Sequence, residues 1–554
     1  MNIHGILHKF TLSVPRQALL SPTIGRFPNR LNSLLRVQAM STVSEEAEAK
    51  DFLDFIDNLK NYEKSGLPKG SGTDSEDGFD LGRMRRLMQL LGNPQCKFKS
   101  VHIAGTKGKG STAAFLSSIL RAEGYSVGCY SSPHIRTIRE RITLGAKGGP
   151  VNASLLNDHF QSLRTVLERA IELENGGLTH FEVLTALAFS LFAQQGVEVA
   201  VIEAGLGGAR DATNIIPSSA LAASIITTIG EEHLAALGDS LESIAVAKSG
   251  IIKDGRPVIL GGPFYPHIER ILCDKASSMS SPVVSTSDPG NNSILRSINK
   301  INGRPYQFCD LVLQIEKDLK LNIEISNVKL SMLGQHQLKN AVTATCAALC
   351  LRNQGWRLST ESVRAGLESA FLLGRNQVLT QNEAERLGLP GATIVLDGAH
   401  TKDSAAALAN TIEMAFPKSS LVLVVSMASD KDHLGFAREL ISATSLKAVF
   451  FTEVSIAGEK SRTTTASKLR ESWIQASEEK GIDIIDYSRN KNEARDPSLD
   501  QTNHRGVIFS EGSLIDCIRI GGDILGAETS CQSGVMVITG SLHIVSAVLS
   551  SIER

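Results

Sequence analysis

Residues 101–112, VHIAGTKGKGST, constrain the fold of this chain more than any other run. Four residues with the character of a buried strand lead into a glycine-rich turn that carries lysines and hydroxyl groups, and an Ala- and Leu-rich helical pattern follows. In such a layout, backbone N–H groups and the N-terminus of a helix surround anionic oxygens, and a lysine neutralises them. The run therefore predicts a phosphate-binding loop between a strand and a helix.

The run departs from the common phosphate-loop spacing G-x-x-x-x-G-K-[ST] in two ways. Gly105 lies only three residues before Gly108, and Gly110 separates Lys109 from Ser111. Taken alone, the same residues also fit a tight turn between a strand and a helix that binds nothing. Other motifs along the chain favour the phosphate-binding interpretation.

A chain of 554 residues is too long for a single hydrophobic core, so we expect two domains with additional segments. No apolar run approaches the ~20 residues that cross a bilayer, so we expect no membrane-spanning segment. The eight cysteines are scattered without a C-x-x-C pair, which favours buried thiols in a reducing compartment over zinc sites or disulfides.

The first 44 residues contain five basic residues and no acidic residue. An acid-free segment with arginines and serines is typical of an organelle transit peptide, and it lacks the long apolar core of a secretion signal. We therefore expect a mitochondrial matrix protein, with a plastid protein or a cytosolic protein with a disordered tail as alternatives. Without this segment the net charge is negative, so the composition gives no reason to expect nucleic-acid binding.

After residue 112, strand and helix patterns alternate along the chain, which is typical of a parallel sheet covered on both faces. The polar stretch at 277–304 predicts a loop, as do 64–78 and 489–505, and the alternation at 308–332 predicts antiparallel strands. The remaining predicted helices are 79–92, 180–194, 241–252, 338–351, 404–415, 434–441, 467–476 and 541–551, and the remaining strands are 126–130, 197–204, 220–229, 392–396, 421–426, 448–452 and 535–539.

These patterns predict an α/β fold in three parts. A transit-peptide-like segment covers 1–44, a phosphate-binding domain with a parallel sheet covers 45–378, and a smaller α/β domain covers 379–554.

Three candidate metal ligands follow strands of the first predicted sheet. Ser132 follows the strand at 126–130, Glu203 lies near the end of the strand at 197–204, and His233 follows the strand at 220–229. Because ligands bind at the carboxyl ends of the strands in such sheets, we expect these side chains near the phosphate loop. A hydroxyl, a carboxylate and an imidazole suit a divalent cation that keeps waters and phosphate oxygens. Each residue also has an ordinary interpretation, as a cap, a surface carboxylate or a loop residue.

Further motifs follow in order along the chain. The full set is GTKGKGST (105–112), SSPH (131–134), RERI (139–142), LTHFE (178–182), EAGLGGARDATN (203–214), EEHLAALG (231–238), IAVAKSGII (244–252), GQHQLKNA (334–341), LDGAHTKDS (396–404), SDKDH (429–433) and TGSLHIV (539–545). With this set the chain resembles the folylpolyglutamate synthase and dihydrofolate synthase family, which is related to the Mur ligases, over roughly residues 79–552.

The resemblance implies a P-loop ATPase domain of the Mur-ligase type, a smaller C-terminal Rossmann-like glutamate-ligase domain, and an active site between them. It also implies ATP-dependent amide formation. A pteroate or folate carboxylate attacks the γ-phosphate of ATP to give an acyl phosphate, and the amine of L-glutamate then displaces phosphate. The implied cofactor is Mg²⁺, with K⁺ as a further cation in some relatives, and the implied partners are small-molecule substrates. We expect a monomer.

The resemblance also implies roles for individual residues. The catalytic group is Lys109, Lys248 and His233, and the metal ligands are Ser132, Glu203, His233 and Lys248. The ATP-binding group is Gly108, Lys109, Gly110, Ser111, Asn340, Arg375 and Asp397, and His400, placed one helical turn past Asp397, is expected to orient substrate in the same cleft. Because phosphoryl transfer is limited mainly by charge repulsion and positioning, Lys109 and the loop N–H groups are expected to hold the β- and γ-phosphates.

Lys248 aligns with a lysine that is carbamylated in relatives, where it becomes a carboxylate-type metal ligand. The alternative is an unmodified ammonium that neutralises phosphate directly.

Two segments depart from the family pattern. Many relatives carry Trp-Pro-Gly-Arg where this chain has LLGR at 372–375, which puts the hinge and the adenine surroundings in doubt. Glu231 and Glu232 precede His233 in this chain, whereas relatives commonly have an acidic residue followed by His-Thr at this place.

Within the family, the segments at 178–182 and 210–214 resemble the dihydropteroate-binding segments of dihydrofolate synthases. The implied substrate-binding residues there are Leu178, Thr179, His180, Phe181, Asp211, Ala212 and Thr213. Asp211 and Thr213 are candidates to hydrogen-bond the pterin and Phe181 to pack on its face, although Phe181 is equally compatible with a core position. We therefore expect a mitochondrial dihydrofolate synthase. The alternatives are a folylpolyglutamate synthase, a bifunctional enzyme, a Mur-type ligase, and a nucleotide-binding regulatory protein without activity.

Overall fold

The structure of the protein, a computed structural model, describes residues 47–73, 79, 81–443, 445–456, 462–486, 506–526 and 534–553, all within one compact unit, Glu45–Arg554. The transit-like segment and the loop predicted at 489–505 lie outside the described residues, as does part of 64–78. Within the described ranges the strands form three sheets with helices packed against them, which confirms the predicted α/β fold class.

The first sheet contains the strand that precedes the phosphate loop. Its strand order is β4-β3-β2-β5-β1-β6-β7-β8, and the pairs from β2 to β8 are parallel, whereas β3 and β4 are antiparallel additions. The strands are β1 (Lys99–Ala104), β2 (Val127–Tyr130), β3 (Ile142–Leu144), β4 (Gly149–Pro150), β5 (Val199–Glu203), β6 (Leu221–Ile226), β7 (Val258–Leu260) and β8 (Val283–Ser285). Because β1 lies between β5 and β6, the loops after these strands meet at one edge of the sheet.

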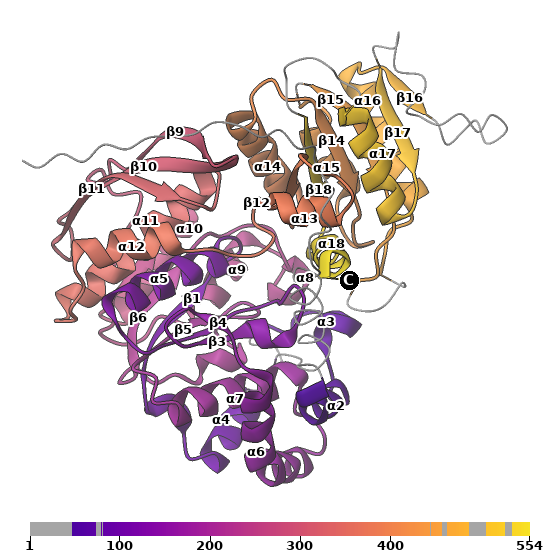
Figure 1. Ribbon diagram of the computed structural model, residues 1–554. Helices are drawn as coiled ribbons and strands as arrows, with labels where there is room; N and C mark the ends of the chain where they lie inside the picture. The colour runs from indigo at the N-terminus through magenta and orange to yellow at the C-terminus, as the bar shows by residue number, and fades with distance from the viewer. Residues whose placement is uncertain are drawn as a thin grey trace, which may run out of the picture. The chain divides into compact units, whose positions relative to one another are not determined.

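Helices cover both faces of this sheet. Val199 and Val201 of β5 pack into one core, and Ala200 and Ile202 pack into the core on the opposite face. Figure 1 shows α5, α11 and α12 on one side and α4, α6 and α7 on the other. The helices of this part are α2 (Lys50–Asp57), α3 (Tyr62–Ser65), α4 (Leu81–Leu90), α5 (Lys109–Glu123), α6 (Ala153–Leu173), α7 (His180–Gln194), α8 (Leu234–Leu237), α9 (Leu241–Ser249), α10 (Pro266–Ser278), α11 (Gln335–Asn353) and α12 (Thr360–Ser369), with 3₁₀ turns η1 (Pro94–Cys96), η2 (Ile138–Arg141) and η3 (Ala212–Ile215).

A small antiparallel sheet packs against α11 and α12. It consists of β9 (Ile294–Ile301), β10 (Arg304–Ile315) and β11 (Leu321–Leu330) in the order β11-β10-β9. The strands predicted at 308–332 are confirmed, but the loop predicted at 277–304 is wrong, because this stretch holds the end of α10, β8 and β9. β9 is an edge strand whose side chains are mostly exposed, so its sequence lacks the clear alternation of a half-buried strand.

The C-terminal part has its own sheet, in the order β12-β13-β18-β14-β15-β17-β16, parallel apart from β12. Leu423 of β14 faces a core with α14, α15 and α16, whereas Val424 faces the core with α17 and α18. The strands are β12 (Gln377–Val378), β13 (Thr393–Leu396), β14 (Leu421–Val425), β15 (Leu446–Phe451), β16 (Ile484–Asp486), β17 (Val507–Glu511) and β18 (Val535–Thr539), and the helices are α13 (Gln381–Arg386), α14 (Lys402–Ala415), α15 (His433–Leu440), α16 (Ala466–Lys480), α17 (Leu514–Gly526) and α18 (Leu542–Glu553).

None of the helices in the described ranges combines the length and the apolar character that crossing a membrane requires.

Candidate active site

A cavity of about 870 Å³ opens at the carboxyl edge of the first sheet. The phosphate loop and the segments after β2, β5 and β6 form one wall, and residues from the C-terminal part, such as Asp397, His400 and His543, form another. The cavity therefore brings together motifs from both α/β parts of the chain.

Glycines give the phosphate loop its shape. Gly105 has φ +150°, and a Cβ atom there would collide with the Thr227 side chain. Gly108 is the N-cap of α5 with φ +85°, and a Cβ atom there would collide with Asn340. Side chains from the segment after β6 and from α11 therefore approach the loop so closely that only glycine fits at these two positions.

Two hydroxyl groups beyond the end of β6 brace the loop. The Lys107 N–H donates to Thr228 Oγ1 (2.9 Å), and the Lys107 carbonyl accepts from Thr227 Oγ1 (2.6 Å). The Thr106 N–H donates to the Thr228 carbonyl (2.8 Å). The loop backbone is thus held in one conformation while its helix N-terminus faces the cavity.

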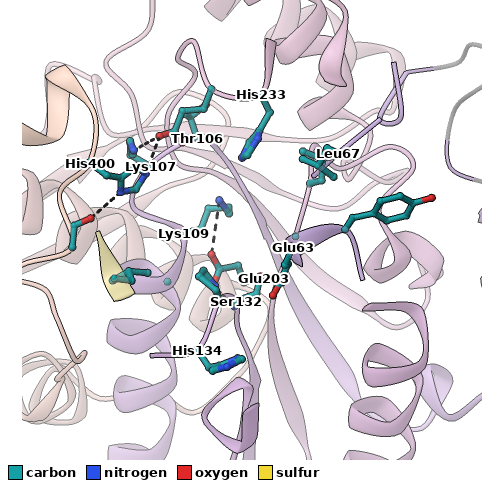
Figure 2. Close-up of a pocket in the computed structure, with 18 of the residues that line it drawn as sticks. Glu63, Leu67, Thr106, Lys107, Lys109, Ser132, His134, Glu203, His233 and His400 are labelled. Atoms are coloured by element: carbon teal, nitrogen blue, oxygen red, sulfur yellow. Dashed lines mark hydrogen bonds and ion pairs between the residues drawn. The ribbon is translucent and has the colours of Figure 1, made fainter. Parts of the chain in front are cut away.

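Lys109, Glu203 and Ser132 lie together beside this helix N-terminus (Figure 2). Lys109 Nζ is 3.9 Å from Glu203 Oε1, and Glu203 Oε2 accepts a hydrogen bond from the Ser132 N–H (3.1 Å). Burial raises the pKa of Glu203, and the Lys109 ammonium opposes that rise. A carboxylate this buried needs a cation beside it, and Lys109 supplies one.

His233 lines the same cavity from the loop after β6 (Figure 2). Its backbone is left-handed, with φ +57°, and burial lowers the pKa of its imidazole to about 4. A neutral imidazole is the form that binds metal ions. Ser132, Glu203 and His233 thus offer one hydroxyl, one buried carboxylate and one neutral imidazole, which fits Mg²⁺ that keeps waters and phosphate oxygens. Within the ranges that the structure describes, no group of three or more His, Cys, Asp and Glu residues is placed to hold a metal ion.

Lys248 contacts the phosphate loop but is not among the residues that line the cavity. It belongs to α9, is buried, and donates from Nζ to the Gly105 carbonyl (2.9 Å). Burial, reinforced by the nearby Lys109, lowers the pKa of Lys248 to about 7. In this conformation the ammonium braces the loop.

The proposed nucleotide ligands from α11 and the linker also meet at the loop. Asn340 Nδ2 donates to Gln337 Oε1 (3.0 Å), and Gln337 Nε2 donates to Ser111 Oγ (3.2 Å). Asp397 accepts from the Asn376 N–H (2.7 Å), so the first loop of the C-terminal sheet is tied to the linker. Gly108, Lys109, Gly110, Ser111, Asn340, Arg375 and Asp397 all line the cavity.

The segment at 178–182 begins α7 and faces the cavity. Thr179 and Glu182 form a capping box, and Leu178 is buried in the core. The Phe181 ring lies so close to the backbone that a Cβ atom on Gly205 would be 2.6 Å from it. Thr179, His180 and Phe181 line the cavity, whereas Leu178 does not.

The polar side chains of segment 211–213 form hydrogen bonds within the protein. Asp211 accepts from the Leu206 N–H (2.7 Å) and from Thr213 Oγ1 (2.5 Å), and Thr213 Oγ1 also lies 2.7 Å from His102 Nε2. Thr213 is fully buried and does not line the cavity, in contrast to Asp211 and Ala212. The predicted hydrogen bond between Thr213 and a pterin is therefore wrong, because the buried Thr213 hydroxyl bonds to Asp211 and His102 instead.

His400 lies beside the phosphate loop but is not one helical turn past Asp397, because α14 begins only at Lys402. Its Nδ1 pairs with the Gly398 carbonyl (2.8 Å), and its Nε2 is 3.8 Å from Glu232 Oε1. Burial opposes the ionisation of Glu232, but the Lys107 ammonium outweighs it and holds the pKa of Glu232 down at about 2.

Two arginines, Arg141 and Arg462, bind Glu63 beside the cavity, and this arrangement was not predicted from the sequence. Arg141 donates from Nε to His134 Nδ1 (2.9 Å) and from Nη1 to Glu63 Oε1 (2.8 Å). Arg462 of the C-terminal part donates to the Glu63 carbonyl (2.6 Å). The motifs RERI and SSPH contain Arg141 and His134, but no spacing in the sequence points to Glu63, which lies 78 residues before Arg141.

Comparisons with known proteins agree with this architecture. Residues 103–348 match the Mur ligase middle domain, and residues 379–514 match the Mur ligase glutamate ligase domain. The chain is 31% identical over 365 residues to the dihydrofolate synthase/folylpolyglutamate synthase of Bacillus subtilis, covering 65% of this chain and 78% of that protein. It is 32% identical over 341 residues to the mitochondrial folylpolyglutamate synthase of Homo sapiens, covering 55% of this chain and 49% of that protein.

Among solved structures, the folylpolyglutamate synthase of Mycobacterium tuberculosis in complex with ADP and AMPPCP is 25% identical, with a TM-score of 0.70. The superposition covers 92% of this chain and 99% of that one.

Proposed function

Because the chain belongs to the folylpolyglutamate synthase and dihydrofolate synthase family of Mur ligases, we propose that it joins L-glutamate to 7,8-dihydropteroate and makes dihydrofolate, ADP and phosphate. The chain is an ATP-dependent ligase of this family, whose members act on dihydropteroate or on folates. The choice of dihydropteroate is the proposal, and its support is the likeness of segments 178–182 and 210–214 to the dihydropteroate-binding segments of dihydrofolate synthases. Phe181 of the first segment lines the cavity.

Phe181 presents its ring to the cavity against the Gly205 backbone, next to the segment that Asp211 holds in place. A flat apolar surface with few polar groups beside it suits the face of a pterin ring. Asp211 and Ala212 also line the cavity. A folylpolyglutamate synthase and a bifunctional enzyme are the alternatives, since the Bacillus subtilis relative carries both names.

The residues at the phosphate loop support the chemistry of acyl-phosphate formation. An oxygen of the substrate carboxylate attacks the γ-phosphorus as the bond to the ADP oxygen breaks. The amine nitrogen of glutamate then attacks the acyl carbon and gives up a proton, while the bond from that carbon to the phosphate oxygen breaks and phosphate leaves. Lys109 and the N–H groups at the start of α5 neutralise and hold the β- and γ-phosphates, because the charge that develops on these oxygens limits the reaction.

Mg²⁺ is part of this proposal. Ser132, Glu203 and His233 would hold the ion, which would supply positive charge to the phosphate oxygens. Lys109 is 3.9 Å from Glu203 Oε1, and with a cation bound there it would be free to contact phosphate instead. Lys248 either carries a carbamate and joins these ligands or remains an amine that braces the loop through the Gly105 carbonyl.

The test is amide formation by the full chain with ATP, Mg²⁺ and L-glutamate, on dihydropteroate and on tetrahydrofolate monoglutamate in parallel. Turnover confined to dihydropteroate supports the proposal. Turnover confined to tetrahydrofolate monoglutamate makes the chain a polyglutamate synthase, and turnover on both makes it bifunctional. Nucleotide binding without amide formation on either acceptor would instead favour a regulatory nucleotide-binding protein.

We also propose a monomer in the mitochondrial matrix, with plastid and cytosol as alternatives. The acid-free composition of residues 1–44 supports import, and the human relative is named as mitochondrial. Cell fractionation with sequencing of the mature N-terminus tests the location, and sedimentation tests the oligomeric state. An intact N-terminus in the cytosolic fraction would reject the import proposal.

A further inference from the structure

Arg141 is the buried partner of Glu63 beside the cavity. Its Nη1 and Nη2 donate to the two oxygens of the Glu63 carboxylate (2.8 and 2.5 Å), and its Nε donates to His134 Nδ1 (2.9 Å). The Arg141 side chain is 0% exposed, whereas the Glu63 side chain is 44% exposed and lines the cavity. Arginine recognises carboxylates through bidentate pairs of this kind. Arg141 therefore has the chemistry of a carboxylate-binding site that a residue of the chain itself already fills.

The backbone around Glu63 is fixed to other parts of the cavity wall. Glu63 lies on α3, and its N–H donates to Asn61 Oδ1 (2.9 Å). The Lys60 carbonyl accepts from the N–H of His180 at the start of α7 (3.0 Å). Arg462 of the C-terminal part donates to the Glu63 carbonyl (2.6 Å). The Glu63 carboxylate is thus a fixed part of the wall and not a mobile side chain at its rim.

Glu63 presents a negative charge to the cavity. Burial opposes the ionisation of Glu63, but the hydrogen bonds and the charge of Arg141 outweigh it and hold the pKa of Glu63 below its usual range. Each of the three guanidinium nitrogens of Arg141 already has a partner, so Arg141 cannot bind a second carboxylate in the same bidentate way. A second carboxylate placed there would instead meet the like charge of Glu63.

This ion pair lies close to the expected place of reaction. His134, which accepts from Arg141, comes two residues after the proposed metal ligand Ser132. Burial raises the pKa of Glu203, and the charge of Arg141 is one of those that oppose this rise. Figure 2 shows Glu63 and His134 among the residues that line the cavity together with Ser132 and Glu203. A carboxylate bound to Arg141 would therefore lie near the reacting carboxylate of the acceptor.

The two candidate acceptors differ in their number of carboxylates. Dihydropteroate has a single carboxylate, and it is the group that reacts. Tetrahydrofolate monoglutamate has a second carboxylate, separated from the reacting one by three carbon atoms, so it stays within about 5 Å of the reacting group. A carboxylate that is withdrawn from water needs a cation or hydrogen-bond donors. A protein can discriminate against such a ligand by leaving its extra charge unpaired.

We propose that Glu63 is a specificity-determining residue, which fills the carboxylate site at Arg141 and so excludes acceptors that already carry a glutamate. This inference rests on the proposed function, because it explains how the cavity would accept dihydropteroate and reject tetrahydrofolate monoglutamate. Removal of the Glu63 side chain should make Arg141 available to the second carboxylate of a folate.

The test compares the Kd of each acceptor by isothermal titration calorimetry with ADP present, so that no turnover occurs. In Glu63→Ala, the Kd of tetrahydrofolate monoglutamate should fall at least about 10-fold, and the Kd of dihydropteroate should stay within about threefold. Glu63→Gln, which keeps the length of the side chain but not its charge, should shift the ratio of the two Kd values in the same direction, and it replaces Glu63→Ala if that variant does not fold.

Glu479→Ala is the matched control. Glu479 also forms a bidentate pair, with Arg438, and is 36% exposed, but it does not line the cavity. Both Kd values of this variant should equal those of the wild type. If Glu63→Ala weakens both acceptors by the same factor, or leaves the ratio of their Kd values unchanged, Glu63 has only a structural role and the proposal is overturned.

A double variant tests the part played by Arg141. Glu63→Ala combined with Arg141→Met removes the cation together with its partner, so the gain in affinity for tetrahydrofolate monoglutamate should disappear. A gain that persists in the double variant would overturn the proposal, because the space left by Glu63, and not the Arg141 site, would then admit the glutamate tail.

Failure of the proposed function is distinguishable from failure of this inference. A wild-type protein that forms amide only on tetrahydrofolate monoglutamate refutes the proposed function. Occupancy of the Arg141 site is measured without any acceptor, as the Tm in sodium acetate against sodium chloride at equal ionic strength. Acetate should raise the Tm of Glu63→Ala but not that of the wild type or of Glu479→Ala, since an exposed guanidinium gains little from an ion pair. Equal Tm values of Glu63→Ala in the two salts would refute the inference alone.

Discussion

The free energy of unfolding falls when the pH is lowered from 8 to 5. In the variant His102→Gln this fall should be smaller by about 2 kcal/mol. His102 lies on β1, two residues before the end of that strand, and its side chain is fully buried. Burial, reinforced by the nearby Lys253, lowers the pKa of His102 from 6.5 to about 3. The imidazole is therefore neutral in the folded protein at neutral and mildly acidic pH.

The sign of the effect follows from proton binding in the two states. Between pH 6.5 and about 3 the unfolded chain binds a proton at His102 and the folded chain does not, so stability falls as the pH falls. The shift corresponds to a loss of about 2 kcal/mol from pH 8 to pH 5, and of about 5 kcal/mol once the pH is below 3. Glutamine does not titrate, and its amide can retain a hydrogen bond to Thr213.

The assay uses urea unfolding at pH 8 and pH 5, followed by tryptophan fluorescence. The chain has two tryptophans, and Trp356 packs against the core that contains β1, next to Tyr125 at 5.3 Å. Trp473 lies in the C-terminal core, so a Trp473→Phe background leaves Trp356 to report on the part that holds His102.

The quantity to compare is the loss in free energy of unfolding between pH 8 and pH 5 in each protein, not the free energy of unfolding at one pH. His102→Gln is expected to be less stable at pH 8, because the shape of a buried site changes. Other buried histidines titrate in both proteins and cancel in the difference. Equal losses between pH 8 and pH 5 in the two proteins would refute the reasoning, because they would mean that His102 binds its proton equally in both states.

Three further predictions concern the site. Lys109→Ala should lower kcat roughly 100- to 1,000-fold by steady-state kinetics, because it removes a phosphate clamp, and an unchanged kcat would contradict the assignment of the loop. His233→Ala should raise the Mg²⁺ concentration at half-maximal rate about 10-fold or more and leave Tm within a few degrees, and an unaltered Mg²⁺ titration would exclude it as a ligand. Phe181→Ala should raise the KM for dihydropteroate more than the KM for ATP, and an equal loss on dihydropteroate and tetrahydrofolate would show that Phe181 does not select between them.

The elements with strong periodicity were predictable from the sequence. The helix predicted at 180–194 is α7, and the strand predicted at 535–539 is β18. The helix α6 was overlooked, although Leu156, Phe160, Leu163 and Leu167 have helical spacing. β9 could not be predicted in the same way, because an edge strand packs few of its side chains and so carries little pattern.

The site residues that lie at the carboxyl ends of strands in one sheet were predictable from the sequence. Ser132 and His233 come after β2 and β6, and Glu203 is the last residue of β5. The parallel arrangement alone places all three at one edge of the sheet. Contacts such as Glu232 with His400 connect segments more than 160 residues apart, and no local spacing encodes them. The burial of Thr213, which lies in η3, could not be predicted either, because its second partner, His102, lies on β1, more than 100 residues earlier in the chain.

The bracing of the phosphate loop determines how nucleotides should bind. Thr227, Thr228 and Lys248 hold the loop backbone by hydrogen bonds that need no ligand. A loop that is already ordered loses little conformational entropy when phosphate arrives, so its affinity depends on charge and contacts and not on folding of the loop. The protein should therefore bind ADP without the large negative heat-capacity change that accompanies coupled folding, and discrimination of ATP from ADP should rest on the γ-phosphate alone.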